Sequence, residues 1–205
     1  MPKPTNKPKT CSKKTWPEFV HTIQQILPTG GVEFWAMDEH RIGLKPILRR
    51  VWSLRGVRPS VLVHHRYQWL YVYGFVHPPS GRTFWLLMPT VSIDAFTVAL
   101  REFAAFCQTG TDKRIFLLLD RAGFHTSPAI ARPSGLDLCF LPPYSPELQP
   151  AEHLWPLSNR PLVNRCFASL DELEAVQAER CNWLQDHPDL VRSATLFHWW
   201  PSRLN

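Results

Sequence analysis

The chain has 205 residues, of which 44% are hydrophobic, and it carries a net charge of +6. This length is enough for one domain with a sizeable core. The sequence contains no run of eighteen or more apolar residues and no apolar signal-peptide core, which argues against a membrane span and predicts a cytoplasmic protein. The five cysteines include no CxxC pair, which is typical of reduced thiols rather than of a zinc cluster or a disulfide framework.

The positive charge is concentrated in two tracts. Residues 1–14 contain five lysines and no acid, and residues 41–66 contain six arginines, one lysine and no acid. Residues 171–189, by contrast, contain six acids and a single arginine. Basic tracts attract polyanions, above all nucleic acid, although they are also compatible with an ordinary solvated surface.

The first thirty residues differ in composition from the rest. Residues 1–15 are rich in lysine, proline and threonine and are expected to form a disordered tail or linker. Apolar residues recur at helical spacing from Trp16 to Leu27, which predicts a short amphipathic helix that ends at Pro28. Residues 1–31 are therefore predicted to be a basic tail followed by one helix.

From residue 32 the pattern becomes that of β-strands. Three long strands are predicted, at 32–37, 69–77 and 83–88, the last two forming a hairpin around the turn at 78–81. Two shorter strands are predicted at 51–54 and 60–64, on either side of a turn at Gly56.

Helices and strands alternate in the second half of the chain. Ser92 is expected to cap a helix that extends to Cys107 and has its apolar residues on one side. Apolar runs predict buried strands at 114–119 and 136–141. Further helices are predicted at 127–132, 151–159 and 170–186. This order predicts an α/β domain whose sheet has an antiparallel half and a parallel half reached by crossovers.

Three carboxylates stand at the ends of these elements. Asp38 follows the first strand, Asp120 ends the strand at 114–119, and Glu152 comes after the last strand. If the first strand lies beside the strand at 114–119, Asp38 and Asp120 meet at the carboxyl edge of the sheet, where ligands bind such folds. Hard divalent cations prefer oxygen ligands, and two such ions can promote phosphoryl transfer. Three acids out of 17 are a weak signal on their own.

Three blocks of sequence sharpen this interpretation. The first is Met37-Asp38-Glu39 with Arg41–Leu44 and Val51-Trp52, the second is Leu118–Ser127, and the third, which is the most specific, is Leu141–Trp155 (LPPYSPELQPAEHLW). With these blocks, residues 32–170 resemble the DDE transposases of the mariner-like superfamily, in their bacterial insertion-sequence branch. The resemblance implies a ribonuclease-H-like (retroviral-integrase-like) α/β fold, with a mixed five-stranded sheet flanked by helices, over residues 32–190. An aromatic C-terminal segment at 191–205 would follow.

The resemblance also implies an activity. Asp38, Asp120 and Glu152 would hold two Mg²⁺ or Mn²⁺ ions and promote phosphodiester hydrolysis at transposon ends, followed by transfer of the freed 3′-hydroxyl into target DNA at a TA dinucleotide. The partners would be DNA and a second copy of the chain. Gln149 stands where many relatives have asparagine, and either amide can hydrogen-bond a loop.

Relatives begin with helix-turn-helix modules, which are not visible in this sequence. We therefore expect either a separately encoded end-binding protein or a truncated copy. Two alternatives to the transposase stay open at this point, namely a ribonuclease-H-like metal-dependent nuclease and a non-catalytic DNA-binding remnant.

Other residues are candidates for DNA contacts or for supporting roles. Arginines can fix backbone phosphates and tryptophan can stack on an unpaired base, which makes DNA-binding candidates of Arg49, Arg50, Trp52, Arg55 and Arg58. Core packing is an equally good explanation for Trp52. His125 is expected to steady a phosphate or the attacking water, or else to bond to the backbone of its own loop.

Three further features are weaker candidates. Glu39 is expected to point away from Asp38 and, like Glu147, is a weaker candidate for a metal ligand. The aromatic run at 197–201 is expected to be exposed and to dock on the domain or on a partner chain.

Overall fold

The computed structural model describes residue 22 and residues 31–61, 63, 66–142 and 146–200. The predicted N-terminal tail and helix lie outside the described residues, apart from Thr22.

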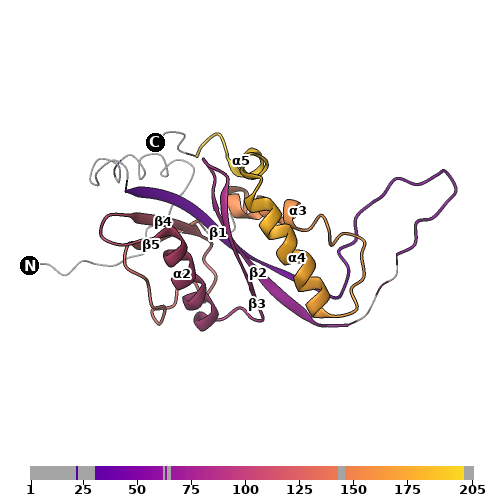
Figure 1. Cartoon of the computed structure of the whole chain (residues 1–205), viewed down its shortest axis with the longest axis horizontal. Coiled ribbons are helices and arrows are strands. Elements are labelled where there is room, and N and C mark those ends of the chain that lie inside the picture. Colours follow the sequence, from indigo (N-terminus) through magenta and orange to yellow (C-terminus); the bar gives the residue numbers. More distant parts are fainter. Residues whose placement is uncertain (1–21, 23–30, 62, 64–65, 143–145, 201–205) are drawn as a thin grey trace, which may run out of the picture.

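A five-stranded mixed sheet forms the centre of the described chain (Figure 1). Its strands are β1 (Val32–Gly43), β2 (Trp69–His77), β3 (Arg82–Met88), β4 (Arg114–Leu119) and β5 (Leu136–Phe140), and their order is β3-β2-β1-β4-β5. β1, β2 and β3 pair antiparallel, whereas β1–β4 and β4–β5 pair parallel. The predicted mixed sheet with one antiparallel and one parallel half is therefore confirmed.

β1 is longer than the sequence pattern indicated. The strand continues through Asp38 and Glu39 to Gly43 because β2 pairs with it along this whole stretch, from Ala36↔Val76 to Gly43↔Trp69. Asp38 therefore lies within β1 rather than after it.

Helices cover both faces of the sheet. They are α2 (Ile93–Cys107), the 3₁₀ helices η1 (Pro146–Leu148) and η2 (Pro150–Leu154), α3 (Trp155–Ser158), α4 (Leu170–Gln185) and α5 (Pro188–Thr195). The expected cap of α2 is present, since the Ser92 hydroxyl accepts from the Ala95 amide at 3.1 Å. Ser169 caps α4 in the same way, accepting from the Glu172 amide at 3.2 Å.

Two of the predicted helices differ in the structure. The segment at 127–132 forms turns instead of a helix, because Pro128 and Pro133 each lack a backbone N–H to donate. The predicted helix at 151–159 is divided into η2 and α3.

Alternating residues of β1 belong to two separate hydrophobic cores. Trp35 and Met37 pack with the apolar side of α2, whereas Phe34 and Ala36 pack on the opposite face with residues of η2, α3, α4 and α5. Figure 1 shows α2 and α4 on opposite sides of the sheet. Trp200 is 2% exposed within the second core, so the expectation that the aromatic run at 197–201 is exposed is wrong for this residue, because it docks on the domain itself.

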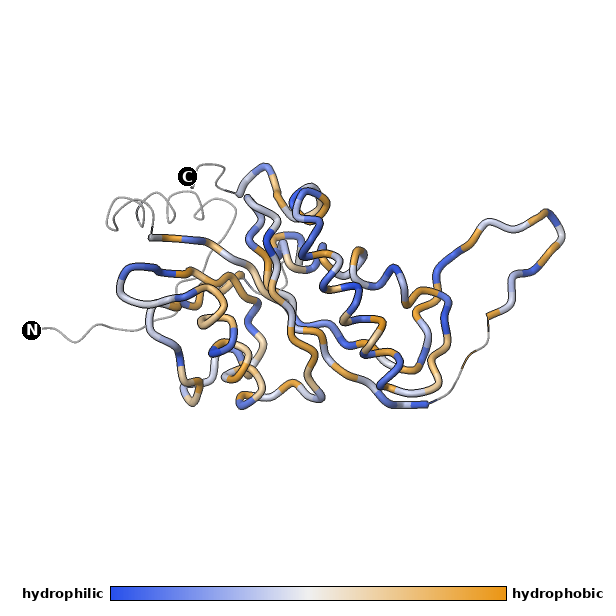
Figure 2. The backbone as a smooth tube through the Cα atoms, in the orientation of Figure 1, coloured by the Kyte–Doolittle hydropathy of each residue, from blue (hydrophilic) through white to orange (hydrophobic). Residues whose placement is uncertain are grey.

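The connection between β1 and β2 extends away from the sheet (Figures 1 and 2). We call residues 45–66 the arm. Its described residues form no strand apart from one bridge, Ile47↔Val163, so the predicted strand at 51–54 is wrong, and the described residues of the other, 60, 61 and 63, are not in a strand either. The described residues of these segments do not pack against a strand or helix that would bury them, and Trp52 and Leu54 are 103% and 80% exposed.

The side chain of Asn164 attaches the base of the arm to the domain. Its amide accepts from the Arg49 N–H at 2.9 Å and donates to the Arg49 carbonyl at 3.1 Å. The arm is therefore fixed at its base and projects from there.

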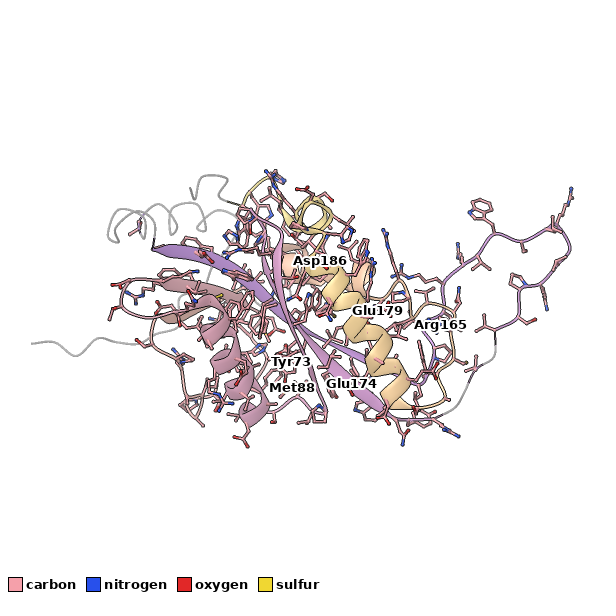
Figure 3. All side chains as sticks on the ribbon, viewed as in Figure 1. Tyr73, Met88, Arg165, Glu174, Glu179 and Asp186 are labelled. Carbon is pink, nitrogen blue, oxygen red and sulfur yellow. The ribbon has the colours of Figure 1, made fainter. Side chains whose placement is uncertain are left out.

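The outer surface of α4 is acidic. Figure 3 shows Glu174, Glu179 and Asp186 along this helix, and all three are exposed. The charge separation predicted from the sequence is therefore also a separation in space, with the basic arm and the acidic helix on different elements. Of the helices that the structure describes, none is long and apolar enough to cross a membrane.

Candidate active site

The register of β1 and β4 brings two of the predicted carboxylates to neighbouring positions. The last parallel pair is Ala36↔Leu118, and Asp38 and Asp120 each follow two residues later. Adjacent strands lie about 4.8 Å apart, so the two backbone positions are neighbours at the carboxyl edge of this half of the sheet.

Asp38 is the most enclosed carboxylate of the three. Burial, together with the negative charges of Glu152 and Glu39, raises the pKa of Asp38 to about 7, although a hydrogen bond from Trp155 opposes the shift. In that bond, Trp155 Nε1 donates to Asp38 Oδ2 at 2.9 Å. A deprotonated Asp38 is therefore costly here unless a positive charge compensates it.

Glu152 comes from η2 and is exposed. Its segment is attached to β1, since Gln149 Nε2 donates to the Met37 carbonyl at 2.9 Å. The amide at position 149 therefore bonds to strand β1, and not to a loop. Ala151 and Leu154 of η2 pack in the same core as Phe34 and Ala36 of β1, so η2 lies on the face of β1 to which Asp38 also belongs.

Asp120 follows β4, and its side chain is 55% exposed. Its Oδ1 accepts from the Ala122 amide at 3.0 Å and lies 2.6 Å from His125 Nδ1. The hydrogen bond with His125 is the main reason that the pKa of Asp120 is lowered.

His125 lies between two carboxylates. Its side chain is 1% exposed, and its Nε2 lies 2.9 Å from Glu39 Oε1 on β1. Burial opposes the charged ring, but the hydrogen bonds with Asp120 and Glu39 raise the pKa of His125 to about 9. The ring is therefore protonated at neutral pH and donates to both acids.

This geometry corrects two expectations about His125. Both ring nitrogens are occupied and the ring is buried against Phe96 and Phe124, so it does not face a position from which it could steady a phosphate or a water. Its ring also does not bond to the backbone of its own loop. Glu39 was expected to point away from Asp38, and its carboxylate bonds to His125 while that of Asp38 bonds to Trp155.

The three predicted ligands offer only carboxylate oxygens, which suit Mg²⁺ and Mn²⁺. Within the described part of the chain, no group of three or more His, Cys, Asp or Glu side chains is close enough together to hold an ion as it stands. The buried Asp38 and the nearby charge of Glu152 nevertheless form a pair that a cation would stabilise, so the donor set fits a hard divalent metal. Glu147, the weaker candidate, is exposed in η1.

Of the predicted DNA-binding residues, all except His125 lie on the arm. Arg49, Arg50, Trp52, Arg55 and Arg58 are exposed. The alternative explanation that Trp52 packs in the core is therefore wrong, since this residue is 103% exposed. A surface hollow of about 470 Å³ at the base of the arm is lined in part by Arg49, Arg50, Val51 and Val61. The structure thus separates two groups, the carboxylates at the sheet and the basic side chains on the arm.

Sequence reasoning did not assign a role to the groups that surround Asp38. His40 stacks on the Trp155 ring with centroids 4.9 Å apart, and Asn159 Nδ2 lies 2.9 Å from His40 Nε2. The one available signal was the position of Trp155 at the end of the third sequence block, because a buried indole N–H usually finds an acceptor.

The sequence of the chain is similar to a family of endonucleases and to a curated bacterial protein. The model of the DDE superfamily endonuclease family matches residues 33–174. A curated relative from Sinorhizobium fredii, described as uncharacterized protein y4pE/y4sA, is 33% identical over 132 residues, which are 64% of this chain and 96% of the relative.

Solved structures of the Mos1 mariner transposase share the fold. A Mos1 paired-end complex with Mn matches with a TM-score of 0.57 and 14% identity over 96% of this chain and 68% of that chain. The Mos1 strand transfer complex matches with a TM-score of 0.55 and 13% identity over 97% of this chain and 67% of that chain. This chain thus spans about two thirds of the Mos1 chains, and its sheet and helices have the ribonuclease-H-like fold that the resemblance implied. Because the family match covers well over half of its residues, the chain belongs to the DDE superfamily endonuclease family.

Proposed function

We propose that this chain is the catalytic domain of a DNA transposase. It would hydrolyse a phosphodiester bond at a transposon end and transfer the freed 3′-hydroxyl into target DNA. The observation that carries the proposal is the arrangement at the carboxyl edge of β1 and β4. There, Asp38 and Asp120 occupy neighbouring positions in register, and Glu152 acts electrostatically on Asp38.

In this proposal Asp38, Asp120 and Glu152 hold Mg²⁺ or Mn²⁺, with two ions in the complete site. Structures of Mos1 paired-end complexes with Mn and with Mg support this choice of metals. Bound ions would supply the Lewis acidity that stabilises negative charge at the attacked phosphate.

The protein residues contribute position and charge. The nucleophiles are water in the first step and the DNA 3′-hydroxyl in the second, so no covalent bond forms between protein and DNA. Such reactions depend on holding the attacking oxygen, the phosphorus and the leaving oxygen in line. The roles of Asp38, Asp120 and Glu152 are to bind the cations in fixed places, and the role of the basic arm is to bind the phosphate backbone.

The arm supports the proposed partners. Arg49, Arg50, Arg55 and Arg58 would contact phosphates, and Trp52 would stack on an unpaired base. The exposed apolar residues of the arm also favour contact with a second copy of the chain, because exposed apolar surface of this kind is typical of interaction sites. The Mos1 neighbours are paired-end complexes, one of them with the left transposon end. By analogy we propose a homodimer bound to DNA, with a separately encoded helix-turn-helix protein as a further partner.

The domain division belongs to the same proposal. The catalytic domain would comprise residues 32–190, with a basic tail and helix before it and the aromatic segment at 191–205 after it. In the cell, the protein would act in the cytoplasm at the nucleoid.

The test is strand transfer with pre-cut transposon ends, a supercoiled target plasmid and Mg²⁺ or Mn²⁺. The wild type is compared with Asp120→Asn, and with Asp112→Asn as a matched control, because Asp112 is an exposed aspartate just before the other end of β4. We expect joined product from the wild type and the control but none from Asp120→Asn. Metal-dependent nicking without joining would favour the nuclease. DNA binding without either reaction, even with the end-binding protein added, would favour the non-catalytic remnant.

A further inference from the structure

We infer that Trp155 is a positioning residue that sets both the orientation of Asp38 and its separation from Glu152. We also infer that Gly74, which has no side chain, leaves the space that the Trp155 ring occupies. The inference deepens the proposed function and rests on it, since it concerns how the proposed ligands are held.

Trp155 connects the segment of Glu152 to the first aspartate. It is the first residue of α3, three positions after Glu152, and its side chain is largely buried with the residue only 7% exposed. Its Nε1 donates to Asp38 Oδ2 at 2.9 Å. One hydrogen bond therefore fixes the Asp38 carboxylate and ties it to the backbone that carries Glu152.

Gly74 lies directly opposite Asp38 on β2, as its register partner. A Cβ atom at this position would lie 2.9 Å from Trp155 Cη2, 3.0 Å from Trp85 Cζ3 and 3.1 Å from Leu154 Cδ1. Glycine in the middle of a strand weakens it and often marks the close approach of another group. Here that group is the Trp155 ring, which occupies the space that a side chain at position 74 would need.

The other surroundings of the ring restrict its movement. His40 stacks on it with centroids 4.9 Å apart and planes at 19°, and Asn159 Nδ2 lies 2.9 Å from His40 Nε2. Trp85 contacts it edge to face at 6.3 Å. The indole N–H is therefore held in one direction, toward Asp38, before any metal binds.

A second anchor acts on the other side of Glu152. Gln149 Nε2 donates to the Met37 carbonyl at 2.9 Å, so residues 149 and 155 are bonded to two consecutive residues of β1, Met37 and Asp38. Glu152 lies midway between these anchors. Its position relative to Asp38 is therefore set by the fold, as pre-organisation of a metal site requires.

The experiment measures Mn²⁺ binding by calorimetry and by electron paramagnetic resonance of the free ion, without DNA. Trp155→Phe keeps an aromatic ring but removes the N–H donor and Cη2, and Gly74→Ala keeps the donor but displaces the ring. The matched controls are Trp183→Phe, which changes a partly exposed tryptophan on α4, and Gly110→Ala, because a Cβ at Gly110 meets no atom within 4 Å.

We expect each test variant to weaken Mn²⁺ binding by about 10- to 100-fold, the usual effect of losing a group that orients a ligand, and the controls to bind normally. Trp155→Phe removes the nearest of the three atoms that a Cβ at position 74 would meet, so the double variant should bind Mn²⁺ about as Trp155→Phe alone does. The indole N–H resonance of Trp155 in Asp38→Ala should differ from that in the wild type, because the variant lacks the acceptor of this N–H.

The outcomes separate this inference from the proposed function. Wild-type Mn²⁺ binding that Asp38→Asn does not reduce would overturn both, since Asp38 would then not be a ligand. Binding that needs Asp38 but is unchanged in Trp155→Phe would overturn the role of Trp155 alone. If the double variant bound Mn²⁺ markedly more weakly than Trp155→Phe alone, the role of Gly74 in making room for the Trp155 ring would be overturned.

Discussion

His125 and Glu39 form a contact between β1 and the loop after β4, with His125 Nε2 2.9 Å from Glu39 Oε1. The two residues are 86 positions apart in the chain, and the other ring nitrogen of His125 is bonded to Asp120. The contact with Glu39 therefore fixes the orientation of the His125 ring, and the ring in turn fixes the orientation of the Asp120 carboxylate. The two aspartates of the proposed site are each oriented by a nitrogen donor, but from opposite faces of the sheet.

Replacement of His125 by Asn should reduce strand transfer by about 10- to 100-fold, because Asp120 loses the partner that orients it. The free energy of unfolding should also fall, by about 1–3 kcal/mol, since the Glu39 carboxylate is left buried without that partner. The double variant Glu39→Leu/His125→Asn removes the unpaired carboxylate, so it should recover stability but not activity. Thermal unfolding and the rate of joining measure the two effects, and His198→Asn, on an exposed histidine, is the control. Full activity in His125→Asn would contradict this role.

Glu152→Gln should abolish strand transfer, whereas Glu147→Gln should leave it within about twofold of the wild type. Both glutamates are exposed and belong to the same short segment, so they form a matched pair. Of these two glutamates, only Glu152 is among the causes of the raised pKa of Asp38. DNA affinity should be similar in both variants because neither residue lies on the basic arm. If Glu147→Gln were the inactive variant, the third carboxylate would have to be reassigned.

In the metal-free protein, the contribution of Asp38 to the free energy of unfolding should decrease as pH rises from about 4 to about 7. Its pKa is raised from 3.8 when unfolded to about 7 when folded. In this window the unfolded chain has released the proton and the folded chain retains it, so folding stability declines with pH. Asp38→Asn removes the effect, so this variant should gain stability relative to the wild type from pH 4 to pH 7. Saturating Mn²⁺ should reverse the difference at pH 8, because the ion stabilises only the wild-type carboxylate.

Thermal unfolding of both proteins at pH 5 and pH 8, with and without Mn²⁺, checks this prediction. The comparison cancels other titrating groups, since only position 38 differs. A stability difference that does not change with pH would mean that Asp38 is ionised throughout, and a lack of response to Mn²⁺ would argue against its role as a ligand.

The sheet was predictable from local patterns, and much of the site was not. The run at 115–119 is continuously apolar because this part of β4 is buried on both faces, and the hairpin of β2 and β3 has its turn at 78–81, so both were visible in the sequence. The strands expected at 51–54 and 60–64 were predicted from a local pattern alone, and their described residues are not in strands. Their apolar pattern is local, whereas a strand also needs a neighbour to pair with, and the arm has none there.

The roles of His125, Glu39 and Gly74 could not be predicted because each depends on a contact between distant segments. Asp38 and Asp120 could be proposed as ligands from their places after apolar runs, but the donors that orient them come from other elements. Trp155 is the intermediate case, since its motif was recognised while its acceptor, Asp38, lies 117 positions away.

The arm should affect DNA binding and leave stability unchanged. Arg55→Gln/Arg58→Gln removes two exposed guanidinium groups, which should lower the slope of log affinity against log salt by about 2 if both contact phosphates. Trp52→Ala should change the free energy of unfolding by less than about 0.5 kcal/mol, because its side chain is fully exposed. Arg101→Gln is the control, as Arg101 is exposed on α2 and pairs with Glu102 at 2.9 Å. Binding titrations at several salt concentrations measure the slope. An unchanged slope in the double variant would show that DNA binds elsewhere, whereas a marked loss of stability in Trp52→Ala would mean that the arm packs against the domain in solution.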